Sequence, residues 1–162
     1  MNPATLDHAG IAQRIPHSGR MCLLHALQAW DAQSIRCTAI SHRDANHPLR
    51  TENGLLAPVA IEYAAQAMAL HGGLHAAACM LPVNMSPDSL APHSRPTPGF
   101  LAAVRGVKMH LPRLDDVPGS LVVSAQRLAG DDRQALYRFT LHSAAGQLLV
   151  EGRATVILNT LP

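Results

Sequence analysis

Aromatic side chains are scarce in this sequence, and it has neither a long apolar run nor a strong net charge. Phe, Trp and Tyr make up 3% of the 162 residues, so the core must consist mainly of smaller aliphatic side chains. No run of about 18 apolar residues occurs, and no basic segment precedes an apolar one at the N-terminus. The net charge of +2 comes from scattered basic residues and does not favour nucleic acid. We therefore expect a cytoplasmic protein that binds neither membrane nor nucleic acid.

Cysteine motifs and cofactor motifs are also missing. The three cysteines are odd in number and none has C-x-x-C spacing, so we expect buried thiols in a reducing compartment. His71 and His75 have a spacing that can place two imidazoles on one metal, but Gly72 stands where an H-E-x-x-H motif has Glu. We interpret them as histidines at a helix end, and the sequence predicts no metal and no cofactor. The cysteines are Cys22, Cys37 and Cys79.

The length suits one domain, residues 1–162, in which a single helix interrupts a series of strands. Short turns between consecutive strands predict an antiparallel meander, and the apolar helix needs a sheet to enclose it. The sequence therefore predicts an α+β fold with the sheet wrapped around the helix. The expected segments are an N-terminal extension over 1–14 with a short helix over 4–14, strands at 21–30, 34–40, 100–111, 119–128, 135–143 and 148–158, a helix over about 58–75, and an irregular, mobile Pro-rich loop over 81–99.

Glu62 is a lone carboxylate in this apolar, alanine-rich helix. Between residues 55 and 70 only Tyr63 and Gln66 also carry polar groups. Desolvating a carboxylate costs several kcal/mol unless it is hydrogen-bonded or protonated. We therefore expect Glu62 to have a raised pKa and to act as an acid or a base. The alternative is an exposed Glu at a helix start, which the helix dipole favours.

Several short strings occur in an order that a known enzyme family shares. Ile15-Pro16-His17 followed by Leu23-Leu24, the helix string 62–66 (EYAAQ), and the segment from 100–104 to 117–121 carry the likeness. They resemble strings of the hotdog-fold 3-hydroxyacyl-acyl-carrier-protein dehydratases, over residues 15–158. The likeness is greatest to the dehydratase-like proteins of aryl polyene pigment clusters. It implies a hotdog fold, in which an antiparallel sheet wraps around one long central helix.

The resemblance also implies a reaction shared between two subunits. In such enzymes a histidine of one subunit removes the proton beside the thioester carbonyl, and a helix carboxylate of the other protonates the departing 3-hydroxyl. By motif position Glu62 takes the acid role, and His47 takes the base role. His42, with Asp44 as an orienting partner, is the alternative base, because the segment around His47 departs from the family's pattern.

Substrate binding is assigned by the same resemblance. In the family, backbone N–H groups at the helix start hold the thioester oxygen. By position these would be the N–H groups of Ala57 and Val59, although Pro58 between them has no N–H to donate. Gln66, one turn after Glu62, is assigned to the same site in support of the carboxylate.

Three functions remain open from the sequence. The first is dehydration of a 3-hydroxyacyl thioester to the trans-2-enoyl thioester, which the pair of His47 and Glu62 favours. The second is an acyl thioesterase in which Glu62 activates water, and the third is a non-catalytic partner subunit of an active hotdog dehydratase. The altered helix start favours these two. The expected partners are an acyl-carrier-protein or coenzyme A thioester, a second copy in a homodimer or higher even oligomer, and, for the third function, a different hotdog subunit.

Overall fold

The computed structural model describes residues 5–80, 99–131 and 133–157, which form one sheet with one long helix on its face. Three single turns of 3-10 helix lie at Gly19–Met21, Ser41–Arg43 and Ala57–Val59. The helices and strands are α1 (His8–Ala12), β1 (Ala26–Trp30), β2 (Ser34–Ala39), α2 (Ala60–Met80), β3 (Phe100–Met109), β4 (Leu121–Gly130), β5 (Gln134–Ser143) and β6 (Leu148–Ile157).

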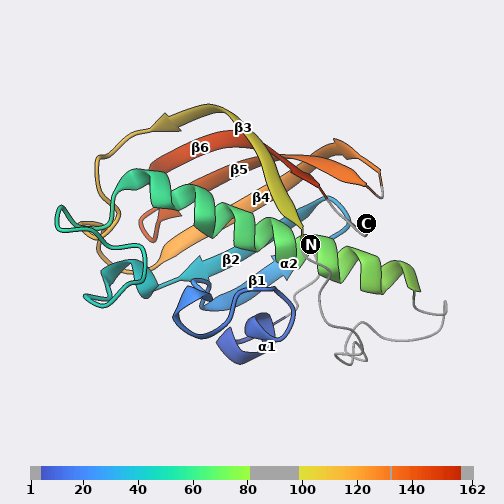
Figure 1. The fold of residues 1–162 in the computed structure, drawn as a ribbon, viewed down its shortest axis with the longest axis horizontal. Helices are drawn as coiled ribbons and strands as arrows, with labels where there is room; N and C mark the ends of the chain where they lie inside the picture. The colour runs from blue at the N-terminus through green and yellow to red at the C-terminus, as the bar shows by residue number, and fades with distance from the viewer. Residues whose placement is uncertain (1–4, 81–98, 132, 158–162) are drawn as a thin grey trace.

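The helix α2 lies along one face of the sheet, which curves around it (Figure 1). Its side chains are apolar on nearly every side, so α2 is stable only where protein surrounds it. Tyr63, Met68 and Leu70 are fully buried, and strand β5 alternates so that Tyr137 and Phe139 enter the same core. The predicted α+β hotdog fold is thereby confirmed.

The sheet order is β1-β2-β4-β5-β6-β3, and all pairs are antiparallel. Strands β4, β5 and β6 form the predicted meander, but β3 lies beside β6 and not beside β4. The segment that follows β3 does not make a tight turn. It runs to the start of α2, where Leu114 N–H donates to Leu55 O (2.8 Å) and Ala57 N–H donates to Pro112 O (2.9 Å). The chain therefore passes the start of α2 before it enters β4, and β3 is an edge strand (Figure 1).

The N-terminal third differs in detail from the expectation. The predicted short helix is present as α1, which begins where the Asp7 side chain accepts from Gly10 N–H (2.8 Å). The first strand covers only Ala26–Trp30, and the start of the predicted 21–30 segment lies outside the ladder. Its backbone groups bond to a side chain of α2, since Leu23 N–H donates to Gln66 Oε1 (2.8 Å).

The helix α2 is longer than predicted. It passes through Gly72-Gly73 and ends at Met80, not near residue 75. The predicted Pro-rich loop over 81–99 lies, except for residue 99, outside the described residues. Cys22 and Cys37 are buried as expected, but Cys79 is exposed because it lies in the last turn of α2, beyond the sheet. No helix within the described ranges is long and apolar enough to cross a membrane.

Candidate active site

The start of α2 is fixed by the segment that joins β3 to β4. Asp115 accepts a hydrogen bond from Leu55 N–H (3.1 Å), and its other oxygen lies 2.9 Å from Arg50 Nη2 and 2.8 Å from Arg113 Nη2. Pro58 lies in the first turn of this helix start, where its missing N–H costs no helical bond. Glu62 follows in the first turn of α2 and is thereby placed at one end of the curved sheet.

Glu62 has two hydrogen-bond donors at a single oxygen. Gln66 Nε2–H donates to Glu62 Oε1 (2.9 Å), and His17 Nε2 lies 3.1 Å from the same oxygen. The side chains of Glu62 and His17 are 29% and 30% exposed. Within the described residues no hydrogen bond or ion pair reaches Oε2. One carboxylate oxygen is therefore anchored, and the other is free to meet a substrate.

The expected raised pKa of Glu62 is wrong for this chain. The hydrogen bond with His17 holds the pKa of the carboxyl below its ordinary value, although partial burial acts in the opposite direction. The bond from Gln66 adds to the lowering. The apolar helix correctly predicted that Glu62 is partly desolvated. The hydrogen-bond donors that compensate for desolvation are Gln66, one turn later, and His17, which is far away in sequence. Glu62 is consequently a carboxylate at neutral pH.

Gln66 is fully buried, and its amide is bonded on both sides. Its Oε1 accepts from Leu23 N–H, and its Nε2 donates to Met21 O (2.7 Å) as well as to Glu62. The two backbone bonds fix which way the amide points, so the N–H that reaches Glu62 is held in place. The buried amide therefore orients Glu62, in keeping with the expected support of the carboxylate, and the assignment of Gln66 to substrate binding stays a prediction.

His47 is nearly buried, and both of its ring nitrogens have partners. Leu49 N–H donates to Nδ1 (3.1 Å), which places the ring hydrogen on Nε2, 3.2 Å from Tyr63 Oη. Tyr63 Oη lies 2.7 Å from Ser41 Oγ, which itself donates to Leu23 O (2.9 Å). His47 Nε2–H therefore donates to Tyr63 Oη, Tyr63 Oη–H donates to Ser41 Oγ, and Ser41 Oγ–H donates to Leu23 O. Neither ring nitrogen of His47 has a free lone pair. Burial lowers the pKa of His47, which keeps the ring neutral.

His42 is completely buried in the short helix after β2. Its Nε2 lies 3.1 Å from Val117 O, so this nitrogen carries the hydrogen, and Nδ1 has no partner among the described residues. Burial lowers the pKa of His42 as well. Within the described chain, no hydrogen bond or ion pair joins Glu62 to His42 or to His47. The pairing of the predicted acid with a predicted base across two subunits therefore stays a prediction.

The two predicted backbone donors at the helix start are already used. Ala57 is buried and donates to Pro112 O, while Val59 N–H donates to Leu56 O (3.0 Å). The second bond belongs to the 3-10 turn Ala57–Val59, which contains Pro58. Neither amide is free to hold a thioester oxygen in this conformation.

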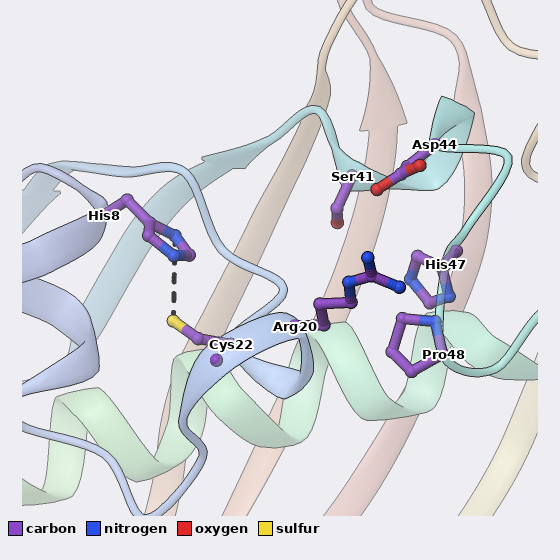
Figure 2. A pocket seen from close by; sticks show the side chains of 8 residues that line it. His8, Arg20, Cys22, Ser41, Asp44, His47 and Pro48 are labelled. Atoms are coloured by element: carbon purple, nitrogen blue, oxygen red, sulfur yellow. Dashed lines mark hydrogen bonds between the residues drawn. The ribbon is translucent and has the colours of Figure 1, made fainter.

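A pocket of about 250 Å³ opens on the side of His47 (Figure 2). Glu62 does not line it, so the pocket is separate from the carboxylate. In Figure 2 the Arg20 side chain points toward His47, and His8 faces the Cys22 thiol, whose Sγ lies 3.8 Å from His8 Nδ1. The lining residues are His8, Gly19, Arg20, Cys22, Ser41, Asp44, His47 and Pro48.

In the part of the chain that the structure describes, no group of three or more His, Cys, Asp or Glu side chains could hold a metal ion. His71, which the sequence placed at the helix end, lies in the interior of α2. Its Nδ1 is 2.9 Å from Tyr137 Oη and its Nε2 is 2.8 Å from Asp31 O, so both nitrogens are committed to the core.

His17 is the residue of the site that the sequence did not reveal. The string Ile15-Pro16-His17 carries part of the family resemblance, but the resemblance gives His17 no role in the site. Its contact with Glu62 joins two segments that are far apart in the chain and depends on the tertiary fold. His17 Nδ1 is buried and has no partner among the described residues, which marks His17 as unusual. This signal comes from the tertiary structure and is absent from the sequence.

Several proteins of known structure are similar to this chain. The dehydratase heterocomplex ApeI:P from Xenorhabdus doucetiae is similar at 21% identity, with 93% of this chain and 91% of that chain covered and a TM-score of 0.75. The thioesterase HI1161 from Haemophilus influenzae is similar at 15% identity, with coverages of 99% and 96% and a TM-score of 0.61. A hypothetical thioesterase protein with coenzyme A from Streptococcus pneumoniae TIGR4 is 8% identical, with coverages of 82% and 84% and a TM-score of 0.54. These likenesses show a shared fold.

The curated proteins contain no sequence match. The family comparison is decisive, because the ApeP-like family, described as ApeP dehydratase, matches residues 9–160 and so nearly the whole chain. The chain belongs to the ApeP-like family of dehydratases.

Proposed function

We propose that this protein dehydrates a 3-hydroxyacyl thioester carried on an acyl carrier protein to the trans-2-enoyl thioester, and that Glu62 delivers the proton to the departing 3-hydroxyl. The observation that carries the proposal is the anchored carboxylate of Glu62 on an otherwise apolar helix. A fixed, partly exposed group that exchanges protons suits a reaction in which hydroxide is a poor leaving group. Membership in a dehydratase family supports the same reaction.

The base in this reaction is proposed from the sequence as His47, with His42 as the alternative. Both rings are held neutral by burial, as a base requires. However, the Leu49 N–H must release His47 Nδ1, or Tyr63 must move, before His47 accepts a proton. His42 has a free Nδ1, but that atom is buried. The geometry therefore supports the carboxylate more strongly than either histidine.

The binding of the thioester is also part of the proposal. Ala57 and Val59 remain candidates for holding its oxygen only if the start of α2 opens, because their amides are bonded within the chain. The resemblance to enzymes that bind substrate between subunits supports placing the acyl group beside a second subunit.

The assembly proposed is a pair of hotdog subunits, either two copies of this chain or this chain with a different hotdog subunit, in the cytoplasm. The edge strand β3 pairs only with β6 in the described chain, and Phe100, Leu101 and Met109 are exposed along it. An uncovered apolar edge strand favours pairing with a partner. The structural likeness to a heterocomplex, ApeI:P, supports the second arrangement.

A thioesterase is the second candidate, favoured by one observation. Glu62 is ionised at neutral pH and has an unoccupied oxygen, which are the properties of a carboxylate that activates water. Thioesterases are also among the proteins that share the fold.

The test is to incubate the purified protein with a 3-hydroxyacyl thioester on acyl carrier protein and to follow the enoyl product by ultraviolet absorbance and mass. Glu62→Gln should lower turnover by about 10²–10⁴, because the amide keeps the shape but exchanges no proton. Release of free acid by the wild type would instead establish the thioesterase. A chain that is inactive alone but activates a co-purified hotdog subunit would establish the partner-subunit function.

Histidine variants locate the base in the same assay. A loss with His47→Ala that matches Glu62→Gln assigns the base to His47, and a loss with His42→Ala alone assigns it to His42. If both variants keep clearly more activity than Glu62→Gln, the base is not a histidine of this pair.

A further inference from the structure

We propose that the face of the sheet turned away from α2 is a docking surface for an acidic helix of a partner protein, and that the neighbouring arginines Arg105, Arg138 and Arg153 receive its carboxylates. These arginines lie on different strands, and only the sheet brings them together. The surface is separate from Glu62, because α2 covers the opposite face (Figure 1). The inference therefore goes beyond the proposed function and does not depend on it.

The strand register places the three arginines in one row. Arg138 of β5 is directly opposite Arg153 of β6, and Arg153 is directly opposite Arg105 of β3. All three side chains are exposed, whereas their neighbours along the strands, such as Tyr137 and Ala154, are buried in the core. Because directly opposite side chains in neighbouring strands share a face, the row lies on the outer face of the sheet.

The outer face is strongly basic, although the whole chain has little net charge. Lys108 of β3 and Arg36 of β2 are also exposed on this face. The carboxylate on it is Glu151, which is opposite Lys108 and lies 3.5 Å from His110 Nε2. Within the described residues, strands β2 to β6 therefore carry five cations and one carboxylate on the outer face, a net charge of +4, compared with +2 for the whole chain.

The row of arginines has no counter-charge within the described chain. The ion pairs found there use other side chains, and none joins a member of the row to a carboxylate. Like charges directly opposite each other in a sheet are destabilising. Arg153 has an arginine on both sides, so the row lowers stability until an anionic partner binds. Such a row is expected where binding, and not folding, uses the charges.

The spacing of the row matches the side chains of a helix. Neighbouring strands are about 4.8 Å apart, so three successive arginines span about 10 Å. On an α-helix, positions i, i+4 and i+7 lie on one side and also span about 10 Å, because each residue rises about 1.5 Å. A helix with Asp or Glu at these positions, lying across β5, β6 and β3, would place one carboxylate at each guanidinium. Arginine can bind a carboxylate through two parallel hydrogen bonds.

Apolar side chains on the same face favour a protein over a phosphate polymer. Phe100 and Ile157 are directly opposite each other on β3 and β6, and both are exposed. Arginine together with aromatic side chains is typical of protein interfaces. A hollow of about 260 Å³ on this face is bordered by Arg36, Ser124 and His142, and its lining contains no carboxylate. Positive charge and apolar area together therefore favour an acidic helix of a protein as the partner.

The first experiment titrates the wild-type protein with two synthetic, alanine-rich helical peptides and follows the backbone amide signals by NMR, which detects weak binding. Both peptides contain the same residues. In one peptide the glutamates lie at i, i+4 and i+7, and in the other they point to different sides of the helix. The aligned peptide should bind more tightly and should shift the signals of β3, β5 and β6. Equal affinities of the two peptides would overturn the proposal.

Arginine variants locate the binding on the row. Arg153→Gln should weaken binding of the aligned peptide about threefold, and Arg105→Gln combined with Arg153→Gln about tenfold, since each exposed ion pair contributes modestly. Arg153→Lys keeps the charge but loses the paired hydrogen bonds, so its affinity should lie between wild type and Arg153→Gln. Arg43→Gln removes an exposed arginine outside the sheet and is the matched control, which should retain the wild-type affinity. Equal losses in Arg153→Gln and Arg43→Gln would contradict a role for the row.

Two further probes test other polyanions at the same salt concentration and the same concentration of negative charge. They are phosphatidylglycerol vesicles and a double-stranded oligonucleotide. Arg153→Gln should weaken the binding of either probe less than it weakens binding of the aligned peptide. If it weakens either one more, the surface is not specific for an acidic helix and the proposal fails.

The last experiment needs no ligand. Urea unfolding at low salt should show a higher midpoint for Arg153→Gln than for wild type, because repulsion from both neighbours is removed. The gain should shrink at high salt, which screens exposed charges. Arg36→Gln, on the same face but opposite Ser124, is the control and should not raise the midpoint. A lower midpoint for Arg153→Gln would show that the row stabilises the fold, and the proposal would be overturned.

Discussion

Two histidines make polar contacts at α2 in opposite ways: His17 approaches the helix from outside, and His71 is part of the helix. Near the start of the helix, His17 reaches Glu62 from another segment, and both side chains are about one-third exposed. In the middle of the helix, His71 lies wholly inside the core between Tyr137 Oη and Asp31 O. The first contact leaves one oxygen and one ring nitrogen unused, whereas the second uses both nitrogens.

The difference separates a group suited to chemistry from a group suited to holding the fold. A buried polar side chain whose bonds are complete stabilises a unique packing but has no capacity left for a substrate. A partly exposed group with an unused atom contributes little to stability and can exchange a proton. The burial of His71 lowers its pKa, so it stays neutral within the core, whereas the hydrogen bond with His17 lowers the pKa of the Glu62 carboxyl.

The largest effect on stability is expected from His71→Leu. The variant removes the nitrogen that meets the buried Tyr137 hydroxyl, and a buried polar group that loses its partner costs about 1–3 kcal/mol. Urea unfolding followed by circular dichroism should show this loss in the free energy of unfolding, with turnover per folded molecule retained. His75→Leu, one turn later and only half-buried, is the control and should change stability by no more than about 0.5 kcal/mol. Equal effects of the two substitutions would remove the distinction between the regions.

A smaller effect is expected from Tyr137→Phe. Only the hydroxyl is removed, the ring remains packed, and His71 keeps its contact with Asp31 O. The free energy of unfolding should fall by about 1 kcal/mol, the lower end of the cost of leaving a single buried polar atom, His71 Nδ1, without its partner. The same unfolding measurement applies. A loss as large as that of His71→Leu would show that the hydroxyl, and not the imidazole, holds this part of the core.

The smallest effect concerns pH and lies at the start of α2. The pKa of Glu62 is lowered in the folded chain, so its contribution to stability is present above the unfolded glutamate pKa of about 4.3 and is lost as the pH falls through the folded pKa. The difference in free energy of unfolding between wild type and Glu62→Gln should therefore shrink between pH 6 and pH 4. Urea titrations at both values measure it. A difference that grows on acidification would contradict the direction of the pKa shift.

Much of the fold could be predicted because its patterns are local. The alternation of Tyr137, Phe139 and Leu141 predicted β5, and the unbroken apolar character of residues 55–70 predicted a helix enclosed by the sheet. The position of β3 could not be predicted in this way, because the predicted meander paired each strand with the next strand in the sequence. Its real partner is β6, and the chain after β3 bonds to the start of α2 through residues 112–114.

The candidate site was predictable only in part for the same reason. A carboxylate in an apolar helix drew attention to Glu62, and helical spacing drew attention to Gln66. The direction of the Glu62 pKa shift depends on His17, which lies 45 residues earlier and approaches only after folding. The bonds that occupy His47 likewise combine its own loop with Tyr63 of α2.

The position of β3 also has a consequence for biosynthesis. Strand β3 is made before β4 and β5, yet it pairs with β6, the last strand of the sheet. During translation its apolar residues, such as Phe100 and Leu101, leave the ribosome before their ladder partners exist. The β4–β5–β6 hairpins close locally, whereas β3 must wait for the chain to be nearly complete. The interval before β6 emerges is therefore the time at which the nascent chain is most exposed to wrong pairing.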